Sequence, residues 1–166
     1  AISTANIAIN QVEKSTELSE AKKELSLGEL HFLRAYFYFD LCRLFGTVPL
    51  LTTSEPENVP RATAEELYAQ IAFDLKTAIE KLPSVKYSAA NNSELGRATK
   101  WAAEALLARA YLFYTGYYQQ ESMPLPDNST LSRTDVITYL DDCINNSGHD
   151  LIGDFRNLWP YSNVYT

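Results

Sequence analysis

The fold class is decided by one stretch of sequence, Phe32-Leu-Arg-Ala-Tyr-Phe-Tyr-Phe-Asp-Leu-Cys-Arg-Leu-Phe45, which is followed at once by Gly46 and three residues later by Pro49. A helix of this sequence carries apolar side chains almost all round, so neighbouring elements must cover it on more than one side. A glycine directly after the last apolar residue and a proline shortly beyond it form a helix stop signal. The stretch therefore predicts the second half of a long helix, at about residues 19–45, within a helical array.

Helical spacing of apolar residues continues along the rest of the chain. It predicts further helices at about residues 2–14, 63–82, 99–114 and 134–146. The helix at 63–82 has the clearest start, because Thr63 stands three residues before Glu66, the spacing of a capping box. Gly116 and Gly148 are expected to close the last two helices, and residues 119–133, with two prolines, to form an exposed excursion. No stretch alternates apolar and polar residues as a half-buried strand does, so the chain is predicted to be all-α.

The helices are predicted to form tetratricopeptide-like pairs. Arg34-Ala35-Tyr36 recurs as Arg109-Ala110-Tyr111, and each copy lies late in an apolar helix that is followed by an amphipathic one. Pairs of this kind stack in an alpha-alpha superhelix and bury faces that no single pair could cover. The repeat units are expected at about residues 19–83 and 98–148.

The predicted domain organisation is a helical-repeat domain at residues 1–148 and an irregular aromatic tail at residues 149–166. Long loops at residues 46–62 and 117–133 depart from plain tetratricopeptide units, whose paired helices are joined by only a few residues, and long loops often carry function. Tyr117-Tyr118 begins the second of these loops and is expected to pack at the helix end or to meet a partner.

The charge balance disfavours nucleic-acid partners. A total of 14 Lys and Arg residues against 21 Asp and Glu residues gives a formal net charge of −7 and a pI of about 4.8. The basic residues are scattered singly or in pairs, as at Lys22-Lys23, so the sequence lacks the basic patch that phosphate backbones and anionic lipid surfaces attract. Asp40 and Arg43 interrupt the best candidate for a membrane-spanning segment, which needs roughly 18 apolar residues.

Catalytic and metal-binding patterns are missing from the sequence. His31 and His149 are the only histidines, and neither has a second ligand residue at helical or CxxC spacing, so no metal or other cofactor is expected. The sequence contains no GxSxG motif, no phosphate-binding glycine loop and no Cys/His pair. Cys42 and Cys143 fall on apolar helix faces, and the sequence leaves open whether they are free or joined. We therefore expect a protein that is not an enzyme.

Two arginines are candidates for structural ion pairs. Arg34 and Arg109 lie among apolar residues, where a buried guanidinium needs a partner. The carboxylates available to them are Glu29, Asp40 and Glu104.

The best candidate for contact with a sugar is the tail, where Trp159, Tyr161 and Asn163 lie close together in sequence. Sugar rings present apolar C–H faces that stack on aromatic planes, and an amide can hold their hydroxyls. Packing of the tail over the last helix pair is nevertheless the favoured interpretation, and contact with a ligand is the alternative. Most other aromatic residues lie at core spacings on helices, namely Tyr36, Phe37, Phe39, Tyr68, Phe73, Tyr111 and Phe113. The chain alone is therefore expected to bind oligosaccharides no more tightly than about millimolar.

Several motifs together resemble one protein family. The stretch from Glu29 to Gly46, with Val48-Pro49-Leu50 after it, is similar to the segment E-x-x-F-L-R-A-x-x-Y-F-x-L-x-x-x-F-G-x-x-P of the SusD/RagB family. Further segments similar to that family follow in the family's order, at Arg61-Ala62-Thr63, Asp74–Pro83, Gly96-Arg97-Ala98-Thr99-Lys100 and Ala105–Tyr111. The resemblance spans about residues 1–160.

This resemblance implies a surface-exposed nutrient-binding lipoprotein of the bacterial outer membrane, anchored through a segment upstream of this chain. It implies a TonB-dependent, SusC-like transporter as partner and an oligosaccharide or other nutrient as ligand. Family members are considerably longer, and their ligand-gripping aromatic residues lie outside the matched stretch, so the chain is expected to be chiefly helical scaffold. The alternative is a tetratricopeptide-type interaction module that binds a peptide, although the long loops favour the first interpretation.

Overall fold

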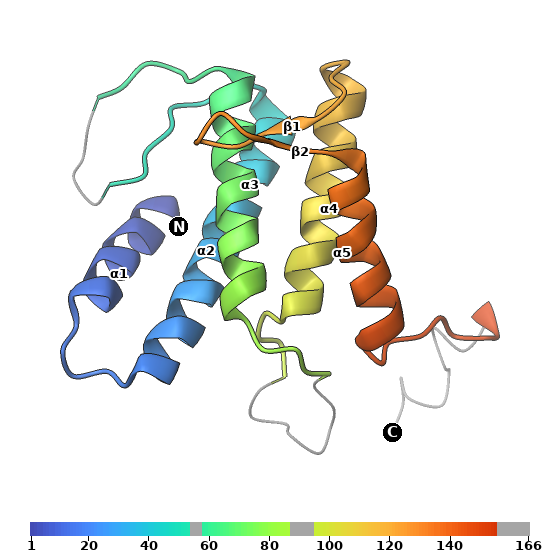
Figure 1. Cartoon of the computed structure of the whole chain (residues 1–166). Coiled ribbons are helices and arrows are strands. Elements are labelled where there is room, and N and C mark those ends of the chain that lie inside the picture. Colours follow the sequence, from blue (N-terminus) through green and yellow to red (C-terminus); the bar gives the residue numbers. More distant parts are fainter. Residues whose placement is uncertain (54–57, 87–94, 156–166) are drawn as a thin grey trace, which may run out of the picture.

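The computed structural model describes residues 1–53, 58–86 and 95–155, and helices dominate this part of the chain (Figure 1). The helices are α1 (Ile2–Lys14), α2 (Glu20–Phe45), α3 (Ala64–Lys81), α4 (Lys100–Tyr117) and α5 (Arg133–Asn146). Among the described residues the strands are only β1 (Met123–Pro124) and β2 (Thr130–Leu131), an antiparallel pair that sets Met123 opposite Leu131. The prediction of an all-α chain is confirmed, and each helix lies close to its predicted bounds.

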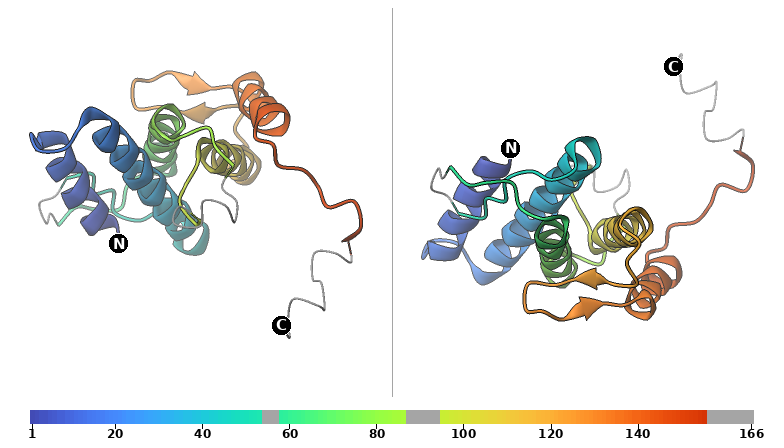
Figure 2. Two further views of the ribbon diagram at one scale, coloured as in Figure 1. Left: turned by 90° about the horizontal axis from the view of Figure 1, so that it is seen from below. Right: turned by 90° about the horizontal axis from the view of Figure 1, so that it is seen from above.

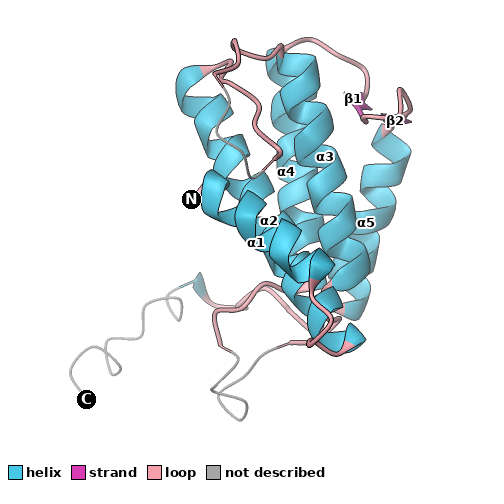
Figure 3. Cartoon of the chain, turned by 90° about the vertical axis from the view of Figure 1, so that its left-hand side faces the viewer, coloured by secondary structure: helices cyan, strands magenta, loops and turns pink. Residues whose placement is uncertain are grey.

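The helices lie in two layers. α3 and α5 form one layer and α2 and α4 the other, while α1 packs on α2 at the edge (Figures 1 and 2). The β1–β2 hairpin lies against the outer side of α3, and the view from the side shows the helices as a bundle with this hairpin near one end (Figure 3). None of the described helices combines the length and the apolar composition needed to cross a bilayer.

The core lies between the two layers and is centred on α3. Leu67, Ile71, Leu75 and Ala78 on α3 are all at most 1% exposed, because they recur at the three- and four-residue steps that place side chains on one helix face. Small residues on α4, such as Ala103 and Ala110, face the core and allow the helices to approach closely.

Local capping signals account for the helix starts. The predicted capping box is confirmed: the Glu66 backbone N–H donates to Thr63 Oγ1 at 3.2 Å, and the Thr63 N–H donates to Glu66 Oε2 at 2.7 Å. A second capping box, not predicted, joins Ser132 and Asp135 at the start of α5. Hydrogen bonds from Ser132 hold the pKa of Asp135 below its usual value.

The predicted end of the fourth helix was wrong. Gly116 lies inside α4, which continues to Tyr117, and the chain turns only at Gln119, whose φ is +55°. The ring of Tyr118 packs against those of Tyr114, at 5.4 Å between centroids, and Tyr68, at 5.8 Å. This aromatic packing holds the last turn, and glycine is only a weak stop signal when the following residues bury surface in the helical conformation.

The expectation of an exposed excursion at residues 119–133 was correct only in part, because residues 119–121 and 126–130 are exposed but three side chains between and beside them are buried. Met123, Leu125 and Leu131 are at most 9% exposed and pack into the core cluster. Polar and proline residues separate these three apolar residues, so the sequence lacks the regular apolar spacing that would predict burial. In the structure the three side chains pack against α3.

Apolar residues of α2 are less completely covered than the sequence suggests. Tyr36 of α2 is 43% exposed and Phe73 of α3 is 44% exposed, although the sequence places both at the helical spacing of core residues. Leu44 and Phe45 at the end of α2 are also exposed. α1 and α3 cover two sides of α2, and the described part of the chain leaves a third side open. Helical periodicity shows which residues share a face but not which faces meet a neighbour.

Candidate functional site

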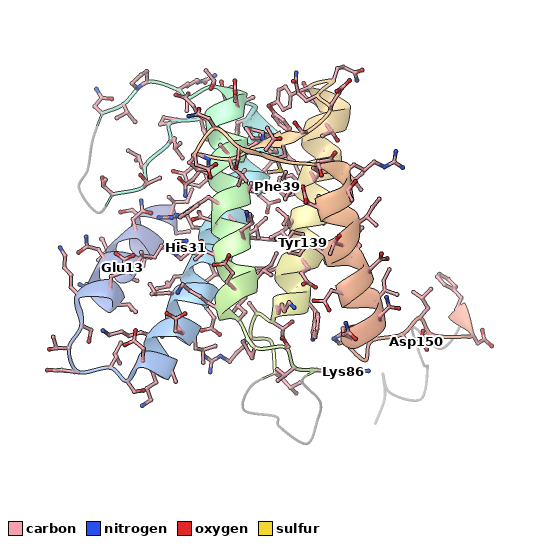
Figure 4. All side chains as sticks on the ribbon, viewed as in Figure 1. Glu13, His31, Phe39, Lys86, Tyr139 and Asp150 are labelled. Carbon is pink, nitrogen blue, oxygen red and sulfur yellow. The ribbon has the colours of Figure 1, made fainter. Side chains whose placement is uncertain are left out.

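A buried polar network joins α1, α2 and α3. Arg34 of α2 donates from Nε and Nη2 to the two carboxylate oxygens of Asp74 on α3, at 2.8 and 2.7 Å. Its third nitrogen, Nη1, donates to Asn6 Oδ1 on α1 at 3.0 Å, and His31 Nδ1 lies 2.7 Å from Asp74 Oδ1. All four side chains belong to residues at most 7% exposed, and Figure 4 labels His31 among the helices that enclose it. The network satisfies its charges internally, which is the condition for keeping ions in a protein interior.

The partner of Arg34 is Asp74 and none of the carboxylates considered from the sequence. Glu29 pairs instead with Arg97 at 2.7 Å, and Asp40 lies 3.6 Å from Arg43 on its own helix. Which helix register brings two charges together depends on tertiary packing. The sequence nevertheless held a signal for Asp74, because this carboxylate stands on the same face of α3 as Leu67, Ile71 and Ala78.

Arg109 differs from its repeat counterpart Arg34. Its side chain is exposed, and the described residues supply no ion pair to it, so the expectation of a second buried arginine was wrong. The matching Arg-Ala-Tyr motifs therefore share a sequence but not an environment. α1 covers the arginine side of α2 with Asn6, whereas nothing in the described part of the chain covers the corresponding side of α4.

The network also fastens the start of the long loop between α2 and α3. Asn6 Nδ2 donates to the Leu51 carbonyl at 2.8 Å, and Tyr38 Oη both donates to that carbonyl, at 2.9 Å, and accepts from the Leu51 N–H, at 2.7 Å. Burial raises the pKa of Tyr38 above its usual value. Further along, the Ala62 N–H donates to the Val48 carbonyl, so both described ends of the loop are tied down.

Tyr38→Phe is expected to lower the free energy of unfolding by about 1 kcal/mol, because two hydrogen bonds to the Leu51 backbone disappear while the ring stays in place. Hydrogen exchange of the Leu51 amide, together with urea unfolding, measures the effect. Tyr36→Phe is the matched control, since Tyr36 is exposed. Equal protection of the Leu51 amide in wild type and Tyr38→Phe would contradict the assigned hydrogen bonds.

A second buried carboxylate lies at the joint between α4 and α5. Glu104 is 0% exposed, and neither of its oxygens has a hydrogen-bond partner among the described residues. Lys100 Nζ lies 3.6 Å from Glu104 and donates to Asp142 on α5, so one ammonium group serves two carboxylates. Burial raises the pKa of Glu104 to about 7, an effect that the Lys100 charge only partly opposes. Glu104 therefore gains or loses its proton near neutral pH.

Hollows with mixed polar and apolar linings lie beside the β1–β2 hairpin. One, of about 390 Å³, lies between the hairpin and the first turns of α3 and is lined by side chains that include Glu65, Gln70 and Asn128. The next, of about 380 Å³, lies between the same end of α3 and the end of α4, where Tyr118 and Gln120 line it. Both are lined by Glu65, Pro124 and Thr130, and we call the two adjoining hollows together the hairpin groove.

The residues predicted to contact a sugar, Trp159, Tyr161 and Asn163, lie outside the described residues, so that expectation stays a prediction. Within the described ranges no three His, Cys, Asp or Glu side chains are grouped as a metal site requires. Cys42 and Cys143 are both free thiols, and burial raises the pKa of Cys42 to about 11, which leaves it unreactive at neutral pH.

Comparison with known proteins relates this architecture to one family. A family model described as starch-binding associating with outer membrane, of the SusD-like type, matches residues 1–112. A SusD-like protein of Bacteroides ovatus is 32% identical over 98% of this chain, which covers 29% of that protein.

Solved structures agree with the sequence comparison. A SusD-like protein of Bacteroides fragilis superposes with a TM-score of 0.74 at 31% identity, over 99% of this chain and 30% of that structure. A laminarin-binding SusD-like protein superposes with a TM-score of 0.76 at 25% identity, over 99% of this chain and 33% of that structure. The chain thus spans about a third of the length of the proteins it matches. It belongs to the SusD-like family.

Proposed function

We propose that the protein containing this chain is a glycan-binding lipoprotein of the bacterial cell surface, anchored in the outer membrane, that captures nutrient for a TonB-dependent, SusC-like transporter. In this proposal the protein binds its ligand and does not transform it. The observation that carries the proposal is the match of almost the whole chain to SusD-like proteins, one of them a binder of laminarin. An uncharged glucan of the laminarin or starch type is accordingly the first ligand to test.

The role proposed for this chain is that of scaffold. Helix pairs at residues 19–83 and 98–148 act as two repeat units of a domain at residues 1–148, and residues 149–166 form a separate tail segment of the sequence. The buried Arg34–Asp74 pair and the Tyr38–Leu51 hydrogen bonds support this role, because they fix helices and loop without presenting charge to solvent. Trp159, Tyr161 and Asn163 remain the proposed sugar contacts within the tail.

A peptide-binding module of the tetratricopeptide type is the second candidate. It is favoured by the open side of α2 and α4, where Leu33, Tyr36 and Leu112 are 42%, 43% and 66% exposed. Exposed apolar side chains on neighbouring helices are typical of interaction surfaces. In the scaffold interpretation the same side chains contact other parts of the larger assembly.

The test uses the complete gene product in its own membrane. Fatty-acid labelling measures whether the protein is acylated. Mass spectrometry shows whether a TonB-dependent transporter is isolated together with it, and retention on immobilised laminarin and starch measures ligand binding. We expect labelling, co-isolation and retention on at least one glycan. A protein that is not acylated, co-isolates no transporter and is retained by neither glycan would contradict the proposal, and specific capture of a peptide would favour the second candidate.

A further inference from the structure

We propose that the hairpin groove is an accessory saccharide site that holds a short stretch of an uncharged oligosaccharide. This inference rests on the proposed function and adds to it a position and a ligand class. The groove is distinct from the tail residues Trp159, Tyr161 and Asn163, because it is built from α3, the end of α4 and the β1–β2 hairpin.

The groove offers both kinds of contact that a sugar ring needs. Tyr118, which is half-buried, lines its α4 end and supplies aromatic surface for apolar C–H faces, whereas the neighbouring Tyr114 is 6% exposed and packs in the core. The Glu65 carboxylate and the side chains of Gln120 and Gln70 follow along its length, and their oxygens can accept from sugar hydroxyls. The Gln70 and Gln120 amide nitrogens also donate within the chain, to Asp74 Oδ1 and to the Tyr118 carbonyl, at 3.0 Å in each case. Convergence of a few polar groups on a hollow with aromatic walls is the usual design of a small-molecule site.

The charges of the groove select the ligand class. Among the described residues its lining includes the carboxylates of Glu65 and Glu66 and no lysine or arginine, although Lys76 lines the next hollow along the hairpin, beyond Leu125 and Pro126. Sulfated or uronic-acid glycans would meet like charge here, whereas hydroxyls of an uncharged glycan can donate to the carboxylates. The described geometry therefore favours an uncharged oligosaccharide over an anionic one.

The walls of the groove are held in place before any ligand arrives. Met123, at 0% exposed, anchors the hairpin in the core, and the Tyr111 hydroxyl donates to the Glu121 carbonyl at 3.0 Å. The Thr63–Glu66 capping box fixes the start of α3. A preformed site loses little conformational entropy on binding, which makes weak contacts sufficient for measurable affinity.

The 166-residue chain is titrated with laminarihexaose and followed by nuclear magnetic resonance of backbone and side-chain amides. We expect a dissociation constant in the millimolar range, because the groove is open and encloses only a short segment of ligand. The signals that move should cluster at the groove and include the side-chain amides of Gln70 and Gln120. An oligouronate of equal length, used as the charged comparison, should move them much less.

The double variant Glu65→Ala/Gln120→Ala removes two polar side-chain groups from the lining of the groove, and both residues are exposed. We expect this double variant to weaken binding of laminarihexaose at least about tenfold. Gln11→Ala combined with Glu13→Ala, both exposed on α1, is the matched control and should leave affinity unchanged. Circular dichroism of both double variants checks that the helices are intact.

Three results would overturn the inference: no cluster of shifts at the groove up to about 20 mM ligand, unchanged affinity in the Glu65→Ala/Gln120→Ala variant, or equal binding of the oligouronate. Failure here is separable from failure of the proposed function. If the complete gene product is retained on a glycan and the groove variant is retained equally, the accessory site is wrong while the glycan-binding proposal stands.

Discussion

Replacing Asp74 by alanine is expected to lower the free energy of unfolding by about 3–5 kcal/mol, the cost of leaving a buried charge without its partner. Asp74 is 0% exposed and accepts from Arg34 through both oxygens. Without the carboxylate, the Arg34 guanidinium stays buried with only Asn6 as a strong acceptor. Urea unfolding followed by circular dichroism at pH 7 measures the loss.

Two comparisons separate this effect from ordinary charge removal. Asp40→Ala removes a half-exposed carboxylate that lies 3.6 Å from Arg43, and it should cost no more than about 1 kcal/mol. The double variant Arg34→Met/Asp74→Leu replaces both buried ions by apolar groups and should cost less than the sum of the single replacements. Additive costs in this cycle would mean that Arg34 and Asp74 do not depend on each other.

Glu104→Gln is expected to stabilise the chain by about 2 kcal/mol at about pH 8.5 and to have little effect at about pH 5. Burial raises the pKa of Glu104 to about 7 in the folded state, above its usual value of 4.5. The folded state therefore holds this proton more tightly than the unfolded chain does. The resulting stability is present in full below pH 4.5 and is lost as the pH rises through 7. Glutamine remains neutral, so the variant escapes that loss.

Urea unfolding at a series of pH values tests this expectation. Glu80→Gln is the matched control, because Glu80 is exposed on α3 and its replacement should change stability little at any pH. A Glu104→Gln difference that stays constant between about pH 5 and pH 8.5 would show that Glu104 does not titrate in this window. Lys100 must remain in both proteins, since its ammonium group contacts Glu104 and Asp142.

The sequence alone determined the features that depend on neighbours along the chain. Helix positions follow from three- and four-residue spacing, and the start of α3 follows from Thr63 and Glu66, because a capping box lies within one helical turn. The second box, Ser132 with Asp135, was equally readable. Family membership was also readable, since the motif from Glu29 to Pro49 is continuous in sequence.

Only the tertiary structure decided which side chains meet across helices. Arg34 lies 40 residues from Asp74 in sequence, and the register of α2 against α3 brings the two together. Glu29 and Asp40 lie on α2 itself, at five and six residues from Arg34, spacings that do not set two side chains side by side on a helix. Arg109 carries the same local motif as Arg34 yet is exposed, because among the described residues no counterpart of α1 covers its side of α4. Periodicity describes the face of a helix, whereas burial, ion pairing and the hairpin groove depend on which faces pack together, and that is a property of the whole fold.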